Sequence, residues 1–145
     1  MSFDFEKFWR TGPAQNWPRS LILCLFTGCD IPQFSTPMAR DPEPATGDMF
    51  NQKFLAFYWK AIEQNPAIHD GAVMIGRKTV HEPYEIVGWS YRLFPPGLGS
   101  AEIVNRGSAI NSCVAMSTVA TVDTAYKITD GHLIRFVGGN MTEIL

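Results

Sequence analysis

The hydrophobic pattern changes its period near Asn65-Pro66, in the middle of the chain, and this change constrains the fold more than any other feature. Before it, from an expected N-cap at Asp48, apolar side chains recur at steps of three and four residues, which is the spacing of one helical face. These side chains are Phe50, Phe54, Phe57, Tyr58 and Ile62. After it, apolar residues alternate with period two, which predicts strands. Helices followed by a run of strands is the pattern of an α+β domain.

Three other segments precede the change of period. Residues 3–9 carry apolar side chains at helical spacing before Gly12-Pro13, and they predict one short helix. Residues 18–26 begin with proline and are followed by Gly28, which predicts a second short helix. Residues 29–48 contain four prolines and show neither period, which indicates an ordered loop that could serve as a lid.

Strands are predicted at residues 72–79, 84–94, 103–115, 119–129 and 132–137. Between the last two, Asp130-Gly131 is a dipeptide that tight hairpin turns prefer, because both turn positions need positive φ. These two strands are therefore expected to be antiparallel neighbours. We expect residues 1–145 to form a single domain, in which a curved antiparallel sheet packs on the N-terminal helices.

Composition excludes several classes of partner. Hydrophobic residues make up 46% of the chain and charged residues 18%, which favours a globular protein. The net charge is -2 and the charges are scattered, so nucleic acid is not an expected partner. The apolar run at residues 21–26 is far shorter than the roughly 20 residues of a membrane helix, so no membrane partner is expected. The acidic start Met1-Ser2-Phe3-Asp4 is unlike a signal peptide and predicts a cytoplasmic location.

The cysteines and histidines do not suggest a metal or redox centre. The cysteines are Cys24, Cys29 and Cys113, an odd number without a C-x-x-C pair, and we expect them to be buried thiols. The histidines are His69, His81 and His132, and none is spaced to share a metal with another. Walker loops, dinucleotide-binding glycine motifs and G-x-S-x-G elbows are also missing from the sequence. We therefore predict neither a metal nor a cofactor.

The segment from Asp123 to Phe136, with its hairpin, resembles the closing strands of the nuclear transport factor 2-like superfamily, which contains the SnoaL-like polyketide cyclases. The order of Trp17-Pro18, Leu25-Phe26-Thr27 and a helix started by Gly47 is also similar to that family. The resemblance implies a cone-shaped fold that encloses an apolar pocket, and a homodimer packed sheet to sheet. It further implies acid/base chemistry, although members of the family also include binders without activity.

One position departs from the family. Many catalytic members place an aspartate on the last strand, about seven residues after the hairpin glycine, where this chain has Gly138. A catalytic acid or base would therefore have to come from elsewhere.

The segment at residues 84–94 carries the first candidates. Strict alternation would place Glu85, Trp89 and Tyr91 on one face. A carboxyl group beside aromatic surface tends to have a raised pKa, which suits a general acid, and the two aromatic side chains would shape a substrate cavity. Alternatively, this face is a dimer interface, or Glu85 is solvated.

Loop residues supply three further candidates. His69 precedes the first predicted strand, where the pocket mouth would lie, and it could shuttle protons. Asp30 occupies a position that resembles one where several family members keep a polar active-site residue. Arg40 could hold an enolate or carboxylate through a charge-assisted pair. The alternative is that Asp70-Gly71 is merely a turn with His69 exposed, and that the other two are surface residues.

Asn105 and Asn111 share parity on the strand predicted at residues 103–115, while Arg106 points to the other face. The two amides could line a cavity and steady a developing oxyanion. Cross-strand hydrogen bonds between paired amides are the alternative.

These residues predict a cofactor-independent acid/base enzyme of secondary metabolism. It would cyclise, isomerise or dehydrate a polyketide or terpenoid in an apolar pocket. Glu85, His69 or Asp30 would move protons, and the remaining candidates would bind the substrate. The rival hypothesis is a binding or assembly module of the same fold without catalysis.

Overall fold

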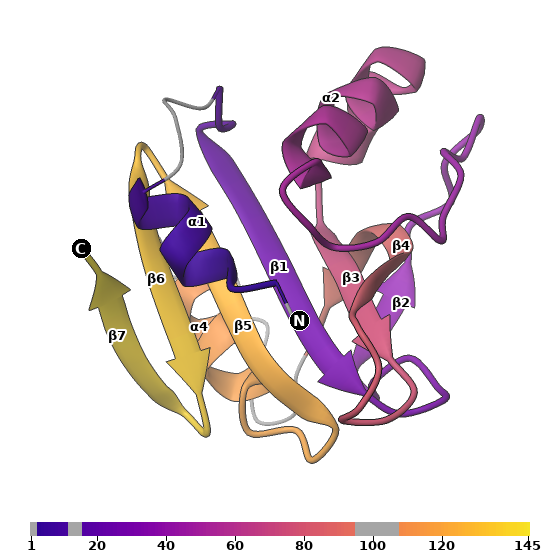
Figure 1. Ribbon diagram of the computed structural model, residues 1–145. Helices are drawn as coiled ribbons and strands as arrows, with labels where there is room; N and C mark the ends of the chain where they lie inside the picture. The colour runs from indigo at the N-terminus through magenta and orange to yellow at the C-terminus, as the bar shows by residue number, and fades with distance from the viewer. Residues whose placement is uncertain (1–2, 12–15, 95–107) are drawn as a thin grey trace.

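The computed structural model describes residues 3–11, 16–94 and 108–145, which form an α+β fold as expected (Figure 1). The strands are β1 (Ser20–Thr27), β2 (Ser35–Pro37), β3 (Ala72–Arg77), β4 (Glu85–Leu93), β5 (Val122–Thr129), β6 (His132–Val137) and β7 (Asn140–Ile144). The helices are α1 (Phe5–Thr11), α2 (Phe54–Gln64), α4 (Ser108–Met116) and the 3-10 turn η1 (Pro66–His69). The strands join in one seven-stranded sheet of order β2-β4-β3-β1-β5-β6-β7.

The sheet is mixed, which corrects the expectation of a wholly antiparallel one. β1 and β3 run parallel, with Ile22 beside Ala72 at one end and Thr27 beside Arg77 at the other. A parallel pair needs a long connection between its strands, and α2 and η1 lie within that connection. All other neighbouring strands are antiparallel.

Residues 18–26 do not form the helix that was expected, because most of them belong to β1 at the centre of the sheet. Both edges of β1 are paired, with β3 on one side and β5 on the other. Both of its faces are covered as well, since the adjacent side chains of Leu23 and Cys24 are each 0% exposed. A strand buried on both faces has no polar side to display, so its sequence reads as one unbroken apolar run.

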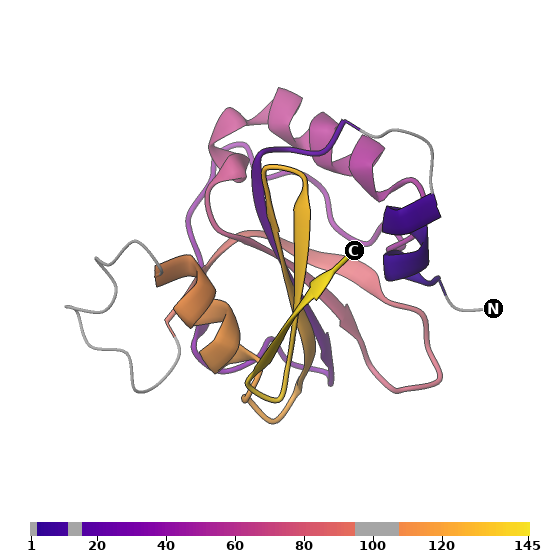
Figure 2. The same cartoon turned by 90° about the vertical axis from the view of Figure 1, so that its left-hand side faces the viewer.

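The strand expected at residues 103–115 is also wrong over the described part of that range, where α4 lies instead. Figure 2 shows α4 and α1 on opposite sides of the β5–β6 hairpin, so helices cover both faces of the sheet. Cys113 of α4 is fully buried and packs with Ala125 and Phe136 of the sheet. The last helix therefore comes from the second half of the chain, which was expected to hold only strands.

The larger core lies between α1, α2 and the sheet, and it is rich in aromatic rings. Phe5 of α1 lies 5.3 Å from Phe50 and 5.0 Å from Tyr126, measured between ring centroids. The buried face of α2 contributes Phe54 and Tyr58, which are both 1% exposed. The aromatic residues of the first half of the chain thus fix both helices to one face of the sheet.

The helix α2 ends before Asn65-Pro66 as predicted, but it begins at Phe54 and not after an N-cap at Asp48. The segment before α2 pairs with the sheet. The Ile86 N–H donates to the carbonyl of Asp48 at 2.8 Å, and the Phe50 N–H donates to the carbonyl of Tyr84 at 2.9 Å. These tertiary hydrogen bonds outweigh the local capping preference of Asp48.

The hairpin between β5 and β6 is confirmed. Thr129 pairs with His132, and the two residues between them have positive φ, 47° at Asp130 and 83° at Gly131. Both values are those that a tight primed turn demands. A third strand, β7, continues the meander after Gly138-Gly139 and was not predicted.

Two of the three cysteines are buried as expected, whereas Cys29 is exposed in the loop after β1. Burial raises the pKa of the Cys24 and Cys113 thiols to about 12. Near pH 8 these two thiols therefore stay protonated and shielded from reagents, and thiolate is the reactive form.

We accordingly expect a thiol reagent such as 5,5′-dithiobis(2-nitrobenzoate) to label one cysteine per folded chain rapidly at pH 8, and all three in denaturant. The Cys29→Ser variant should lose the rapid phase and keep the other two thiols. Rapid labelling of two or more thiols in the folded protein would contradict the burial of Cys24 and Cys113.

Candidate functional site

The three predicted acid/base residues do not meet. His69 ends η1, just before the first residue of β3, whereas Glu85 pairs with Gly76 near the far end of that strand. Asp30 lies in the loop beyond the last residue of β1, beside a separate pocket. All three side chains are exposed. They occupy different places on the molecule and do not form one catalytic site.

The common face predicted for Glu85, Trp89 and Tyr91 is wrong, because β4 contains two register shifts against β3. Trp89 packs in the core below α1 and α2, where its Nε1–H donates to the carbonyl of Ala45 at 3.0 Å. Tyr91 packs on the opposite face. Each shift adds a residue to one strand and reverses the alternation, and Ser90 takes a positive φ of 60° beside one of them.

The predicted binding residues divide similarly. Arg40 is held at the junction of η1 and β3, where its Nε donates to Ser90 Oγ at 2.9 Å and a terminal nitrogen lies 3.5 Å from an Asp70 carboxylate oxygen. Asn111 is exposed on α4. Asn105 and Arg106 lie outside the described residues.

An open cavity of about 500 Å³ lies at the end of the sheet where β1 runs two residues beyond its pairing with β3. We call it the Lys127 pocket. Most of its wall is apolar, and this part is formed by Pro18, Leu21, Ile22, Tyr58, Trp59, Ile62 and Ala109. Its polar lining includes Ser20, His69, Asp70 and Lys127. Of the predicted acid/base residues, His69 thus lies at this pocket, with Nδ1 2.8 Å from the carbonyl of Pro66.

Lys127 is the unusual member of this lining. The residue is 7% exposed, and its ammonium nitrogen donates a hydrogen bond to Ser20 Oγ. Within the described part of the chain, no carboxylate forms an ion pair with it. Burial lowers the pKa of Lys127, an effect that the Cys113 thiol and Asp130 partly oppose. A buried amine with a lowered pKa inside a cavity is a candidate for proton transfer or nucleophilic chemistry.

Sequence reasoning missed Lys127, because a lone lysine in an alternating strand is ordinarily solvated. A signal was nevertheless present. Ala125 and Tyr126 are neighbours of opposite parity, and both are apolar, which indicates a strand covered on both faces. A lysine in such a strand has no solvated face to occupy.

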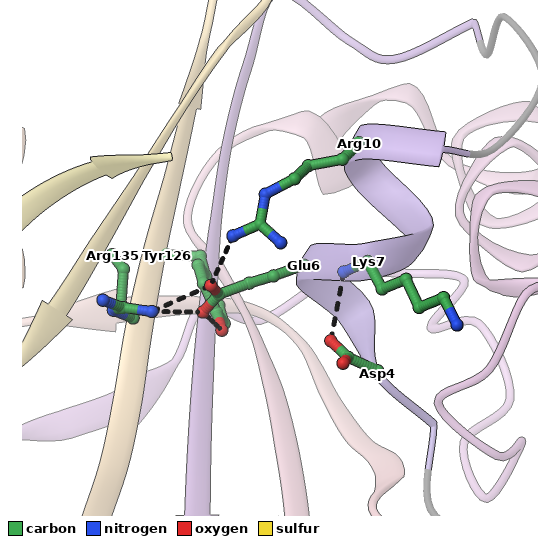
Figure 3. Close-up of polar contacts among 6 residues, drawn as sticks. All are labelled: Asp4, Glu6, Lys7, Arg10, Tyr126 and Arg135. Carbon is green, nitrogen blue, oxygen red and sulfur yellow. Dashed lines mark hydrogen bonds and ion pairs between the residues drawn. The ribbon is translucent and has the colours of Figure 1, made fainter. Parts of the chain in front are cut away.

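A second cavity, of about 350 Å³, lies between α1 and the sheet, and we call it the α1 pocket. Figure 3 shows the contacts of the Glu6 carboxylate with Tyr126 and Arg135. It accepts from the Tyr126 hydroxyl at 2.6 Å and from Arg135 Nη1 at 2.8 and 3.0 Å, while Arg10 lies 3.7 Å away. Burial and the hydrogen bond to Glu6 raise the pKa of Tyr126, so the phenol remains a donor.

A similar cluster surrounds Asp123, and two of its members, Arg77 and Tyr84, line the α1 pocket. The Asp123 carboxylate accepts from the hydroxyls of Tyr84 and Thr27, and Arg77 lies 3.8 Å from it. The Arg77 guanidinium also stacks over the Tyr84 ring at 4.3 Å. Burial raises the pKa of Tyr84, and the hydrogen bond to Asp123 raises it further. Both clusters pair a carboxylate with a tyrosine and an arginine. The first ties α1 to the sheet, and the second ties Tyr84, the residue before β4, to β5.

Within the ranges that the structure describes, no group of three or more histidine, cysteine, aspartate or glutamate side chains could hold a metal ion.

No protein-family model matches the sequence, and the comparison with curated proteins gave no match. Among solved structures, the chain is similar to the hypothetical membrane spanning protein from Bacillus cereus, with a TM-score of 0.57 and 14% sequence identity. The similarity covers 88% of this chain and 55% of that one, so this chain spans about half the length of its neighbour. At this identity the likeness concerns the fold alone. Among the helices described, none combines the length and apolar character that crossing a membrane requires.

Proposed function

We propose that the protein is a cofactor-independent acid/base enzyme that acts on an apolar small molecule in the Lys127 pocket. The observation that carries this proposal is a lysine that is 7% exposed, without a carboxylate partner in the described structure, at the polar side of a cavity with apolar walls. Because burial lowers the pKa of Lys127, a larger fraction of this amine is neutral, and a neutral amine is a base.

The substrate class in this proposal is the one expected from the sequence, a polyketide or terpenoid intermediate that is cyclised, isomerised or dehydrated. The apolar walls suit such a skeleton. His69 stays in the proposal as a proton carrier at the pocket, whereas Glu85 and Asp30 do not. A cone-shaped enclosure typical of nuclear transport factor 2-like proteins, a homodimer and a cytoplasmic location are further parts of the same proposal.

The titration of Lys127 gives the first test. Chains labelled by reductive ¹³C-methylation should show one dimethyl-lysine resonance that titrates below the usual lysine pKa of about 10.4. The Lys127→Met variant should lack that resonance, and the exposed Lys53 provides the matched control through Lys53→Met. The charged and titratable groups near Lys127 are Arg19, Tyr58, His69, Asp70, Cys113 and Asp130. Five lysine resonances that all titrate together would contradict the proposal.

Turnover gives the second test. Native mass spectrometry of the protein purified from its own cells should reveal a bound apolar molecule, which then serves as the assay substrate or product. Lys127→Met should lower kcat by roughly 100-fold or more if the amine is a general base, with the fold intact by circular dichroism. Unchanged kcat in this variant would overturn the catalytic role.

A non-catalytic binding domain is the second candidate. It is favoured by the α1 pocket, where Glu6 is already engaged by Tyr126 and Arg135, and where the lining residues Arg77 and Tyr84 are engaged by Asp123. Carboxylates so occupied are poor general bases, because their lone pairs accept other hydrogen bonds. A ligand that binds at the α1 pocket and is released unchanged by the protein would support this candidate.

A further inference from the structure

Ser20 lies beside Lys127 because of the register between two strands. Ile22 pairs with Lys127 across the antiparallel β1/β5 ladder, and Ser20 pairs with Thr129 two residues further along each strand. Residues two apart on a strand share a face, so the Ser20 hydroxyl and the lysine side chain emerge on the same side as diagonal neighbours. The register of the central strands therefore fixes the two groups relative to each other.

Within the described residues, few other groups compete with Ser20 for the amine of Lys127. Within the described residues, Ser20 Oγ is the hydrogen-bond partner of the Lys127 amine. Asp130, the nearby acid that acts on the Lys127 pKa, is engaged with Arg19 at 3.1 Å. Ser20 is itself exposed and lines the pocket, so a ligand can reach its oxygen. The pair thus consists of an accessible hydroxyl and a buried amine in direct contact.

We infer that Ser20 and Lys127 form a nucleophile and general-base pair that transfers the acyl group of an apolar ester. A serine hydroxyl is a weak nucleophile until a neighbouring base takes its proton, and a lysine with a lowered pKa is able to do so. This inference rests on the proposed function, because it uses the same pocket and the same amine.

The chemistry balances without an oxidant or a cofactor. Lys127 takes the hydroxyl proton of Ser20 while Oγ attacks the ester carbonyl carbon. The tetrahedral intermediate then breaks its bond to the alcohol oxygen, which leaves with the proton from the lysine ammonium. Water attacks the acyl-serine next and gives its proton to Lys127, and the carboxylic acid departs as that proton returns to Ser20 Oγ. The net reaction converts ester and water into acid and alcohol.

The pocket fits the acyl part of such an ester. Leu21, Tyr58, Trp59 and Ile62 present apolar surface beside the pair, and the volume of about 500 Å³ accommodates a medium-length chain or a small ring system. Among simple esters, we expect a longer acyl group to react faster than acetate, since the added methylenes bury apolar area.

The experiment incubates the full chain with p-nitrophenyl acetate, butyrate and octanoate, and separately with a fluorophosphonate. Intact-mass analysis and peptide mapping then locate the label. We expect acylation and phosphonylation at Ser20, with octanoate fastest. Ser20→Ala should abolish labelling, and Lys127→Met and Lys127→Arg should each slow it by at least about 100-fold. The matched controls Ser35→Ala and Lys53→Met, which lie outside the pocket lining, should label at the original rate.

Two outcomes would overturn the inference: a wild-type chain that is unlabelled or labelled away from Ser20, and labelling of Ser20 at an unchanged rate in both lysine variants. Site mapping on the wild-type chain decides the first even if a variant fails to fold. An unlabelled Ser20 together with a low-pKa lysine resonance would remove the acyl-transfer step alone. A Lys127 resonance that titrates like the other four would remove the acid/base proposal as well.

Discussion

Gly76→Val is expected to lower the free energy of unfolding by about 3 kcal/mol, at the upper end of the usual cost of overpacking. Gly76 of β3 pairs with Phe26 of β1, and the Phe26 ring lies over the glycine. A Cβ at position 76 would lie 2.5 Å from Phe26 Cζ and 2.9 Å from both Cε atoms. The ring is 3% exposed among well-packed side chains, so it has little room to move. Urea denaturation followed by circular dichroism measures the effect.

The Phe26→Leu variant supplies the control, because it removes the atoms that a valine at position 76 would meet. In that background Gly76→Val should cost clearly less than in the wild type, which gives a favourable coupling in a double-mutant cycle. Gly88→Ala is a milder comparison, since the ring it meets belongs to the half-buried Tyr91. A loss from Gly76→Val that is the same in both backgrounds would show that the ring is not its cause.

Glu6→Ala is expected to cost about 2 kcal/mol, less than the loss of a partner in a fully buried ion pair because Arg135 keeps access to water. The substitution removes the acceptor of both the Tyr126 hydroxyl and the Arg135 guanidinium. The Glu6 side chain is 16% exposed and that of Arg135 is 36% exposed. Tyr126 is buried and would keep an unpaired hydroxyl. Thermal and urea unfolding should both report the loss.

A cycle between Glu6→Ala and Tyr126→Phe isolates the hydrogen bond, because Tyr126→Phe deletes only the hydroxyl. We expect a coupling of about 1 kcal/mol. Arg10→Ala tests an exposed partner of the same carboxylate at 3.7 Å and should change stability by under about 0.5 kcal/mol. A negligible effect of Glu6→Ala would mean that α1 is held by its aromatic contacts alone.

The elements predicted correctly are those whose local pattern agrees with their tertiary setting. β6 carries two fully buried apolar side chains, Leu133 and Phe136, and its turn carries the residues that positive φ requires. The sequence predicts the wrong structure for β1 and α4, because neither segment shows the hydrophobic period of the element that it forms. An apolar run of six residues at 21–26 suits a buried helix and a doubly covered strand equally. The small side chains of α4, as at Ala109, Ser112 and Ala115, carry little amphipathic contrast.

The candidate site was predicted less well than the fold, and the reason is register. Alternation along β4 fails where the strand shifts against β3, so Glu85 and Trp89 could not be assigned to faces from sequence spacing. The proximity of Ser20 and Lys127 depends on a pairing between segments far apart in the chain. The position of His69 near a pocket mouth could be predicted, because it depends only on where the helical pattern ends and the strand pattern begins along the chain.

The central position of β1 also matters for how the chain matures on the ribosome. β1 is synthesised well before β5, although one of its two edges pairs with β5. Until β5 arrives, a nascent chain that has already paired β1 with β3 presents an open strand edge with apolar side chains on both faces. Such an edge invites association with other chains. The strand β5, together with β6 and β7, therefore covers this edge only after it has been synthesised. Chains released before Val122 should depend on chaperones to stay in solution.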